Sequence, residues 1–476
     1  MAQYLTSQEI ADFAPAGCTP AYPDELTKPL RDGLKRDDWF TPQQLAGRHF
    51  PMACIALEIT QRCNLDCTLC YLSDLAEVVK DTPISELYRR IEMIHAHYGD
   101  YTNVQITGGD PTLRSIDDLV QIVKIIRSFN MRSSMLTNGI KASRKMLEAM
   151  SEAGLNDVVF HVDMTQERKG YHSEMELNTI RLEYMERAKG LPLRVLFNTT
   201  AFDGNMREIP ELVAFFTSHA DRINLASFQL QADTGRGVLR ERDADMVSQA
   251  SVMRALEKGT GQALTFNMPL IGHPDCNKYT AILTCGTSRA LLYDDNNLFT
   301  RLFAKLEHSG EDWSVEEAIL PRAIRALTRS PLLLIQAMRY GIRKAWPLRS
   351  GLLRRNKIHR ISFFIHNFMD EEKLERRRCE SCVFMVATAD GPLSMCVHNA
   401  KRDEMISRPA PANNEQSAWN PLEPEVAKAK GELALPIKRL KGRMRQQMMD
   451  KLGKAKKKVP KKKAESKEYG RINSPS

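Results

Sequence analysis

The sequence contains no long hydrophobic run. None of its 476 residues lies in a stretch that approaches the roughly 18–20 uncharged apolar residues of a membrane-spanning helix. Residues 1–17 lack the basic start and the apolar core of a secretory signal. No repeat recurs at the periods of solenoid proteins. We therefore expect a soluble, cytoplasmic protein, and the length predicts two or three domains.

Acidic residues are nearly missing from two segments. Residues 318–369 contain no Asp or Glu and eleven Lys or Arg. Residues 438–463 contain thirteen Lys or Arg and a single acid. Such segments favour an anionic partner, which is either a lipid headgroup surface or a nucleic acid. The first segment is also rich in Leu, with Tyr340 and Trp346, as in helices that lie at a membrane interface.

Ten cysteines occur in the chain. Because no export signal is visible, they indicate thiolate chemistry rather than disulfide bonds. Their spacing is uneven, and two groups stand out: a tight set near residue 65 and a dispersed set beyond residue 275.

Apolar runs and amphipathic segments alternate through the first half of the chain. The runs fall at residues 54–60, 103–109, 132–139, 157–163, 193–202 and 222–231. Each gap leaves room for one helix, as in repeated βαβ units. Six parallel strands would form either a partial barrel or an open doubly wound sheet, and the pattern alone does not separate these two folds. After about residue 240 the pattern loosens.

Cys63, Cys67 and Cys70 follow the first apolar run at CxxxCxxC spacing. Three thiolates on one short loop suit iron–sulfur ligation and leave one iron without a protein ligand. The alternative is a structural zinc site that takes a distant fourth Cys. The position after a strand favours a functional site, because α/β sheets bind ligands at the carboxyl ends of their strands.

A glycine turn follows the second run, with Gly108, Gly109, Asp110 and Pro111. Together with the cysteine loop, this turn makes the sequence resemble the radical S-adenosylmethionine (radical SAM) superfamily. In that superfamily a CxxxCxΦC loop follows the first strand of a partial (β/α)6 barrel, and a GGEP-like turn follows the second. The resemblance implies an α/β fold with this partial barrel and a C-terminal Cys-rich region.

The resemblance also implies a chemistry. A [4Fe–4S] cluster on the three cysteines binds S-adenosylmethionine through its open iron. An electron from a flavodoxin- or ferredoxin-type donor cleaves the C5′–S bond, and the resulting 5′-deoxyadenosyl radical abstracts hydrogen from an unactivated carbon.

Further S-adenosylmethionine contacts are implied by position in the family. The aromatic residue that precedes the third Cys in the family is Leu69 here, so adenine packing is expected to fall partly to Tyr71. The implied cofactor-binding residues are Tyr71, Gly108, Gly109, Asp110, Thr137, Asn138, Asp163 and Asn198. The last four have ordinary structural alternatives, because strand-end turns and helix caps use the same residue types.

The second set comprises Cys276, Cys379, Cys382 and Cys396, which we call the auxiliary cysteine set. A CxxC, a later Cys and a remote Cys make a four-thiolate site of cluster or zinc type, and beside a radical SAM loop a second [4Fe–4S] cluster is expected. Cys285 is either an alternative ligand or a buried small hydrophobe.

Sequences around this set narrow the resemblance. Residues 273–276 (HPDC), 367–370 (NFMD) and 378–399 resemble a branch that includes archaeal tetraether lipid synthases and methanopterin-precursor methylases. The chain departs from these relatives in having only Cys18 and Cys54 near its start, so no third metal centre is expected.

Five segments are predicted. Residues 1–51 form an N-terminal extension, 52–240 the core barrel, 241–400 a region with the auxiliary cluster and basic amphipathic helices, 401–437 a linker, and 438–476 a disordered basic tail. The expected function is hydrogen abstraction from an apolar substrate such as a membrane lipid, for carbon–carbon bond formation or methylation, by an enzyme peripheral at the inner face of the membrane. The alternatives are a radical enzyme that modifies RNA or a peptide, and a non-catalytic iron–sulfur electron carrier.

Overall fold

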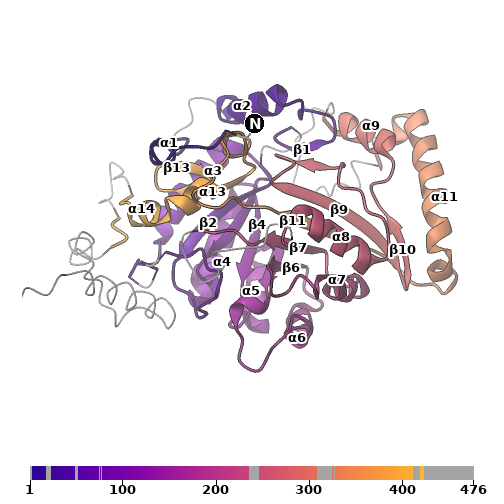
Figure 1. Cartoon of the computed structure of the whole chain (residues 1–476), viewed down its shortest axis with the longest axis horizontal. Coiled ribbons are helices and arrows are strands. Elements are labelled where there is room, and N and C mark those ends of the chain that lie inside the picture. Colours follow the sequence, from indigo (N-terminus) through magenta and orange to yellow (C-terminus); the bar gives the residue numbers. More distant parts are fainter. Residues whose placement is uncertain are drawn as a thin grey trace, which may run out of the picture.

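The structure is a computed structural model that describes residues 3–17, 23–48, 52–73, 75–76, 78–234, 246–307, 324–325, 327–410 and 419–422. The predicted tail 438–476, most of the predicted linker and Cys18 lie outside these residues. One sheet of eleven strands organises the described part of the chain (Figure 1).

Six parallel strands form the centre of this sheet. They are β2 (Cys54–Thr60), β3 (Asn103–Gly108), β4 (Arg132–Thr137), β5 (Asp157–His161), β6 (Arg194–Ala201) and β7 (Leu225–Leu230). They pair in sequence order without a reversal, which is the winding of a barrel and not of a doubly wound sheet. The predicted fold class is confirmed, and all six apolar runs coincide with these strands.

Helices connect these strands and cover their outer side. They are α3 (Ile84–Tyr98), α4 (Ile116–Ser128), α5 (Arg144–Glu152), α6 (Asn178–Ala188) and α7 (Ile209–Ser218). Ser115 and Ser143 cap α4 and α5 by accepting a hydrogen bond from a backbone N–H of the first turn. Ile122 and Leu147 belong to the continuous core between helices and sheet. This shell holds the strand ends in fixed positions.

Two later strands extend the parallel sheet at both edges. β11 (Ile358–His366) pairs in parallel with β7, and β12 (Phe384–Thr388) pairs in parallel with β2. No described pairing joins β11 to β12, so the barrel stays open there. The rings of Phe364 and Phe384 nevertheless lie 5.9 Å apart across this opening.

The remaining strands lie where the apolar pattern of the sequence loosens. β9 (Asn277–Cys285) pairs with β11 over nine residue pairs, and β10 (Ser288–Leu291) continues the same sheet. β9 runs antiparallel to both of its neighbours, so a search for βαβ spacing misses it. β13 (Gly391–Ser394) ends the opposite edge beside β12.

Both ends of the described chain pack on the barrel. The N-terminal elements are α1 (Ser7–Asp12), α2 (Pro23–Arg36) and β1 (Gln44–Ala46), and the C-terminal ones are α12 (Arg376–Glu380), α13 (Met395–Ala400) and α14 (Arg402–Ser407). In the middle of the chain, α8 (Gln249–Thr260) packs beside α7, and β8 (Leu270–Ile271) pairs with β1. Leu5 shares a buried cluster with Leu374 and Val397. The N-terminal extension is thus integrated with the Cys-rich region.

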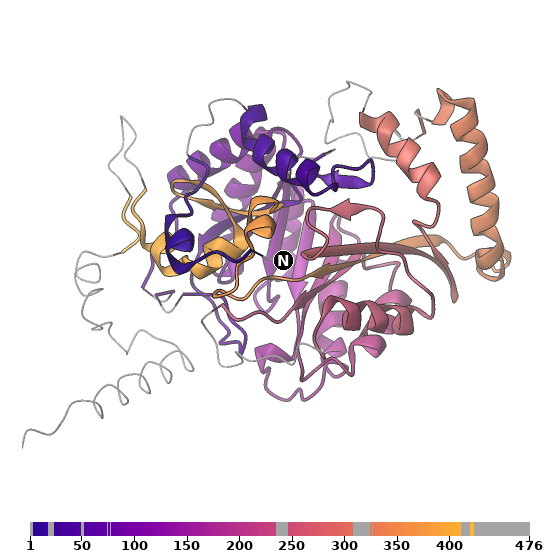
Figure 2. The same cartoon turned by 45° about the horizontal axis from the view of Figure 1, so that its top comes forward.

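Helices α9 (Asn296–Glu307) and α11 (Pro331–Leu353) lie beside each other at the periphery of the molecule (Figures 1 and 2). α11 is the long helix predicted from the basic segment, and it packs on β10. Among the described helices, none combines the length and the apolar character that a bilayer crossing requires.

Candidate active site

The three-cysteine loop follows β2 at the carboxyl end of the barrel. Cys63, Cys67 and Cys70 form no disulfide bond among the described residues and are partly exposed, and all three line a cavity of about 640 Å³ that reaches into the barrel. Burial raises the pKa of Cys70 to about 11, and burial followed by the neighbouring thiols raises the pKa of Cys67 well above its usual range. A positively charged group bound by these thiols would oppose both effects.

The glycine turn packs against the start of this loop. A Cβ on Gly108 would lie 1.9 Å from the carbonyl oxygen of Thr60, and one on Gly109 would lie 2.0 Å from that of Arg62. The backbone N–H of Gly109 donates to the Thr60 carbonyl at 2.8 Å. The glycines are therefore required for close contact between the end of β3 and the cysteine loop.

Asp110 ties this turn to the next strand. Its carboxylate accepts hydrogen bonds from the backbone and hydroxyl of Thr112, from the hydroxyl of Thr137 and from the backbone N–H of Asn138. The side chain is fully buried, and these bonds occupy both oxygens. Asp110 therefore acts as a positioning residue for two loops, although it lies at the cavity wall.

Two further contacts fix the cysteine loop. The Asn138 side-chain amide donates to Asn64 Oδ1 at 2.6 Å and lies 4.0 Å from Cys63 Sγ. The backbone N–H of Thr68 donates to the carbonyl of Thr165, in the 3-10 turn after β5, at 2.8 Å. The loop is thus held by the ends of neighbouring strands, which limits how far its thiols can separate.

Tyr71 lies over a buried ion pair. Its hydroxyl donates to the Gly108 carbonyl at 3.0 Å, and the guanidinium of Arg402 lies 4.6 Å from its ring centre. Arg402 donates to Glu58 Oε1 at 2.7 Å, and Gln61 donates to the other carboxylate oxygen at 2.8 Å. Burial alone would raise the pKa of Glu58, but Arg402 outweighs it and holds that pKa at about 2.

Asp163 does not line the cavity, unlike the other predicted contacts. It caps the 3-10 turn Met164–Gln166 by accepting from the backbone N–H of Thr165, and it also accepts from that of Thr200 at 2.7 Å. Its Oδ2 lies 2.6 Å from Nε2 of His161, which does line the cavity. Burial would raise the pKa of Asp163, but His161 and the hydrogen bonds outweigh it and lower that pKa. Asp163 therefore orients His161.

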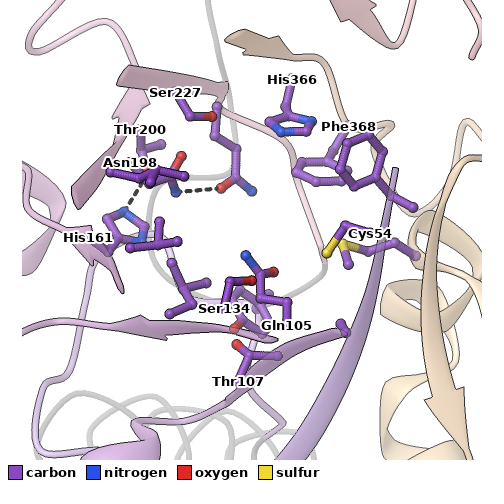
Figure 3. A pocket seen from close by; sticks show the side chains of 18 of the residues that line it. Cys54, Gln105, Thr107, Ser134, His161, Asn198, Thr200, Ser227, His366 and Phe368 are labelled. Atoms are coloured by element: carbon purple, nitrogen blue, oxygen red, sulfur yellow. Dashed lines mark hydrogen bonds between the residues drawn. The ribbon is translucent and has the colours of Figure 1, made fainter. Parts of the chain in front are cut away.

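A polar wall crosses the barrel interior below the loop (Figure 3). Asn198 donates to Gln229 Oε1 at 3.3 Å, and Gln105, Ser134 and Ser227 complete the wall. The Ser227 hydroxyl is buried and has no hydrogen-bond partner among the described residues. Because these strand positions alternate along the chain, side chains two apart point into the same cavity.

An aromatic wall closes the open side of the barrel. It consists of Phe364, His366, Phe368 and Phe384, and all four line the cavity. The rings of His366 and Phe368 are stacked with centres 5.7 Å apart (Figure 3). Burial lowers the pKa of His366 to about 3, so its ring is neutral at physiological pH. One end of the cavity is therefore apolar and the other is polar.

The auxiliary cysteine set comes together behind this aromatic wall. Burial raises the pKa of Cys379, and the nearby thiols of Cys396, Cys382 and Cys276 raise it further. Arg378 Nε donates to Cys276 Sγ at 3.2 Å. The four cysteines, which come from three segments of the chain, thus form one group.

The NFMD segment connects this group with the cavity. The Asn367 N–H donates to the Cys276 carbonyl at 2.8 Å, and the Met369 N–H donates to the Cys396 thiol. Phe368, which lies between them, lines the cavity. The segment therefore places an aromatic side chain directly between the auxiliary cysteines and the barrel interior.

Cys285 lies elsewhere. It is fully buried in β9, donates to the Asn356 carbonyl at 3.4 Å and packs with Ala290 and Leu348. It fits the buried-hydrophobe alternative.

In the described part of the chain, no three His, Cys, Asp or Glu side chains converge as ligands of a single ion do. Thiolates of a cubane cluster bind different irons and are spaced more widely than ligands of one ion.

The cavity gathers most of the predicted residues and adds others. Those that line it are Cys63, Cys67, Cys70, Tyr71, Gly108, Gly109, Asp110, Thr137, Asn138 and Asn198. Sequence reasoning missed His161, Gln229, Arg402 and His366. The first two could have been found from strand alternation, since each lies two positions from another inward-facing residue. His366 has the same relation to Phe364 on β11, whereas Arg402 gives no local signal.

The radical SAM superfamily model matches residues 57–216. A 7,8-dihydro-6-hydroxymethylpterin dimethyltransferase from Methanocaldococcus jannaschii is 26% identical over 186 residues, which cover 38% of this chain and 36% of the relative. A PqqA peptide cyclase from Gluconobacter oxydans is 28% identical over 193 residues, which cover 38% of this chain and 50% of the relative. The chain thus spans half or less of the length of these two curated relatives.

Among solved structures, Streptococcus suis SuiB bound to its precursor peptide SuiA superposes with a TM-score of 0.34. The superposition covers 47% of each chain at 16% identity.

Proposed function

Residues 57–216 are a radical SAM domain, and on this premise we propose that the chain cleaves S-adenosylmethionine reductively and abstracts hydrogen from a substrate held in the barrel cavity. The observation that carries the proposal is the placement of Cys63, Cys67 and Cys70 on one loop at the mouth of that cavity. When bound there, a [4Fe–4S] cluster supplies the electron that breaks the C5′–S bond.

The donor set fits this group. Three thiols face one cavity, and the loop that carries them is held by Asn138 at one end and by Thr165 at the other. Burial, followed by the nearby thiols, raises the pKa values of Cys67 and Cys70, and a cationic cluster core would oppose this effect. The superfamily uses the same three-thiolate arrangement with S-adenosylmethionine.

Several side chains have roles that follow from their positions. The glycine turn at residues 108–109 presents backbone groups at the cavity wall beside the cysteine loop. Asn198 and His161, on neighbouring strands, offer hydrogen bonds deeper in the barrel. Tyr71 is held by the Gly108 carbonyl and by Arg402, so it closes the mouth of the cavity as a fixed wall. These residues bind, orient and exclude water.

The auxiliary cysteine set is proposed to hold a second [4Fe–4S] cluster. Its four thiols are grouped, largely buried and paired with one cation, Arg378. Anaerobically reconstituted protein should carry about eight irons per chain. Cys379→Ala with Cys382→Ala should remove about half of this iron, whereas Cys285→Ala should remove none. Stoichiometric zinc with only four irons would instead support the structural-metal alternative.

The substrate is proposed to be amphipathic. The polar wall includes the Ser227 hydroxyl, which is buried and has no hydrogen-bond partner among the described residues. A wholly apolar molecule would leave this group unpaired, at a cost of about 1–3 kcal/mol. The aromatic wall of Phe364 and Phe384 suits an apolar portion. A lipid with a polar head meets both requirements, and the similarity to a pterin dimethyltransferase supports methylation-type chemistry.

A peptide is the second candidate, because its backbone groups would also satisfy the polar wall and one similar protein is named a peptide cyclase. Comparative lipid, peptide and metabolite mass spectrometry of a deletion strain separates the two candidates. RNA stays a third possibility, tested by direct binding.

The test of the chemistry is an anaerobic incubation of dithionite-reduced protein with S-adenosylmethionine. The wild type should form 5′-deoxyadenosine, and Cys63→Ala with Cys67→Ala and Cys70→Ala should form none while it loses about four irons. Cys285→Ala is the matched control, because it also removes a buried thiol. Cleavage that persists in the triple variant would refute the proposal, and a wild type that forms no 5′-deoxyadenosine would favour an electron carrier.

A further inference from the structure

Helix α11 is apolar on two opposite faces. Its inner face packs on the barrel through Leu333, Lys344, Leu348 and Gly351, which are the buried residues of the helix. A Cβ on Gly351 would lie 2.0 Å from the Cys285 carbonyl, so the helix lies directly on the end of β9. This face fully accounts for the attachment of α11 to the protein.

The outer face carries a second row of large apolar side chains. Met338, Ile342, Trp346 and Leu353 recur at helical spacing half a turn away from the packed residues. They are 53%, 73%, 70% and 83% exposed, and Ile335 lies in the same row. Scattered exposed hydrophobics are ordinary, but a continuous row along a helix about 35 Å long is not.

Cations surround this row. Arg339, Arg349, Arg354 and Lys357 are exposed, and none forms a salt bridge with a described residue. By contrast, Arg343 and Lys344 pair with Asp294 on the side that faces the protein. No acid occurs between residues 318 and 369 to neutralise the others. The outer face is thus apolar at its centre and positive around its margin.

From this distribution we propose that α11 docks on an anionic membrane surface and lies in the interfacial plane. The row of Ile342, Trp346 and Leu353 would enter the headgroup–acyl boundary, while arginines would contact anionic headgroups. Trp346 suits this place because its ring is apolar and its N–H is polar, and Arg349 already lies 4.2 Å from that ring centre.

The charge distribution on the outer face of α11 argues against a second copy of the chain or another protein as its partner. A second copy packed through this face would bring the same unneutralised cations together across a twofold axis. A protein partner would need a strongly acidic groove. The helix itself does not qualify as a membrane span among the described helices, so it lies on the surface of the bilayer.

The docking proposal does not depend on the proposed chemistry, because vesicle binding is measured without S-adenosylmethionine. The experiment is flotation of the full-length protein with vesicles of phosphatidylcholine, with and without phosphatidylglycerol, at low and at physiological salt. Binding should require phosphatidylglycerol and should weaken as salt rises, because charge interactions are screened within about 8 Å at physiological salt. A part of the binding should resist salt, owing to the inserted side chains.

Two variants separate the salt-resistant part of vesicle binding from the salt-sensitive part. Ile342→Ser with Trp346→Ser should weaken the salt-resistant partition about a hundredfold, since several buried methylene equivalents are lost. Its control is Tyr88→Ser with Leu182→Ser, which changes two exposed apolar residues on α3 and α6. Arg339→Glu with Arg354→Glu should weaken only the salt-sensitive part, in contrast to Lys124→Glu with Lys145→Glu on α4 and α5.

Four outcomes would overturn the proposal. The first is equal flotation with neutral and anionic vesicles. The second is unchanged salt-resistant binding in the Ile342 and Trp346 variant, which would assign any binding to other basic segments. The third is a dimer in analytical ultracentrifugation that this variant dissociates, which would make a second copy the occupant. Tight RNA binding without a preference for anionic vesicles would identify a nucleic acid as the partner.

Discussion

The buried ion pair below Tyr71 gives the sharpest test of how the site is built. Arg402 is 2% exposed, and its guanidinium contacts both the Glu58 carboxylate and the Tyr71 ring. Arg402→Met keeps the length of the side chain and removes its charge. Glu58 would then be left buried with only the hydrogen bond from Gln61 and the weaker charge interaction with His398, so we expect the free energy of unfolding to fall by about 3 kcal/mol at pH 7.

The pKa of Glu58 gives a similar value for the contribution of the ion pair to the free energy of unfolding. That pKa lies at about 2 in the folded protein, against 4.5 ordinarily, despite the opposing effect of burial. At 1.36 kcal/mol per pKa unit, the difference corresponds to about 3 kcal/mol of stability. Because the folded pKa is depressed, this stability is present above about pH 4.5 and is lost as pH falls toward 2. The deficit of the variant should therefore shrink on acidification.

The assay is urea unfolding followed by far-UV circular dichroism at pH 7 and at pH 4. A double-mutant cycle with Glu58→Gln isolates the pair, and the double variant should lose much less than the sum of the single losses. Arg144→Met is the control, because its ion pair with Glu148 is exposed and should contribute little. Additive losses, or a deficit that is the same at both pH values, would refute the role assigned to this pair.

Three further predictions concern the walls of the site. Gly109→Ala should prevent iron incorporation at the three-cysteine loop, because the new Cβ would overlap the Arg62 carbonyl. The control Gly341→Ala should leave the iron content unchanged, because its Cβ would meet no atom within 4 Å. Iron analysis of anaerobically reconstituted protein distinguishes the two outcomes. Gln105→Ala should lower conversion of the native substrate at least about tenfold while 5′-deoxyadenosine still forms, because Gln105 lies in the polar wall and is not among the implied cofactor contacts. Equal loss of both products in a turnover assay would contradict a substrate-binding role. Asp163→Asn should destabilise the protein by about 2 kcal/mol at pH 7, because this carboxylate accepts several buried hydrogen bonds. His161 and these hydrogen bonds outweigh burial and lower the folded pKa of Asp163, so the loss should stay nearly constant down to about pH 4 and should shrink at about pH 2. An equal loss at pH 7 and pH 2 in thermal unfolding would contradict this.

The positions of the six barrel strands and of the three-cysteine loop along the chain were determined by the sequence, whereas the order of the strands in the sheet was decided by the tertiary structure. Residues 54–60 and the five later apolar runs are local patterns, and parallel strands joined by single helices have few ways to pack. The spacing of Cys63, Cys67 and Cys70 and the glycines at 108–109 are local features too. Ligation by the cysteines and contact of these residues with S-adenosylmethionine stay predictions.

Other features depend on segments far apart in the chain, so only the tertiary structure decided them. Asp163 was predicted as a cofactor contact. Its carboxylate instead accepts a hydrogen bond from the backbone N–H of Thr200 and lies within hydrogen-bond distance of His161. Arg402 reaches Glu58 across 344 residues of sequence. No local pattern encodes such pairings, because they arise from the register of separate strands.

The same reason applies to the auxiliary cysteines and to α11. The sequence left open whether Cys276 or Cys285 is the fourth auxiliary ligand. Cys276 directly precedes β9 and lies near Cys379, whereas Cys285 is the last residue of that strand and is buried at its other end. For α11, the sequence predicted a basic helix with many apolar residues, but an apolar residue can face the core or the solvent. Packing on β10 buried Leu348 and left Ile342 and Trp346 outside, and that division, rather than the composition, creates the surface proposed to meet the membrane.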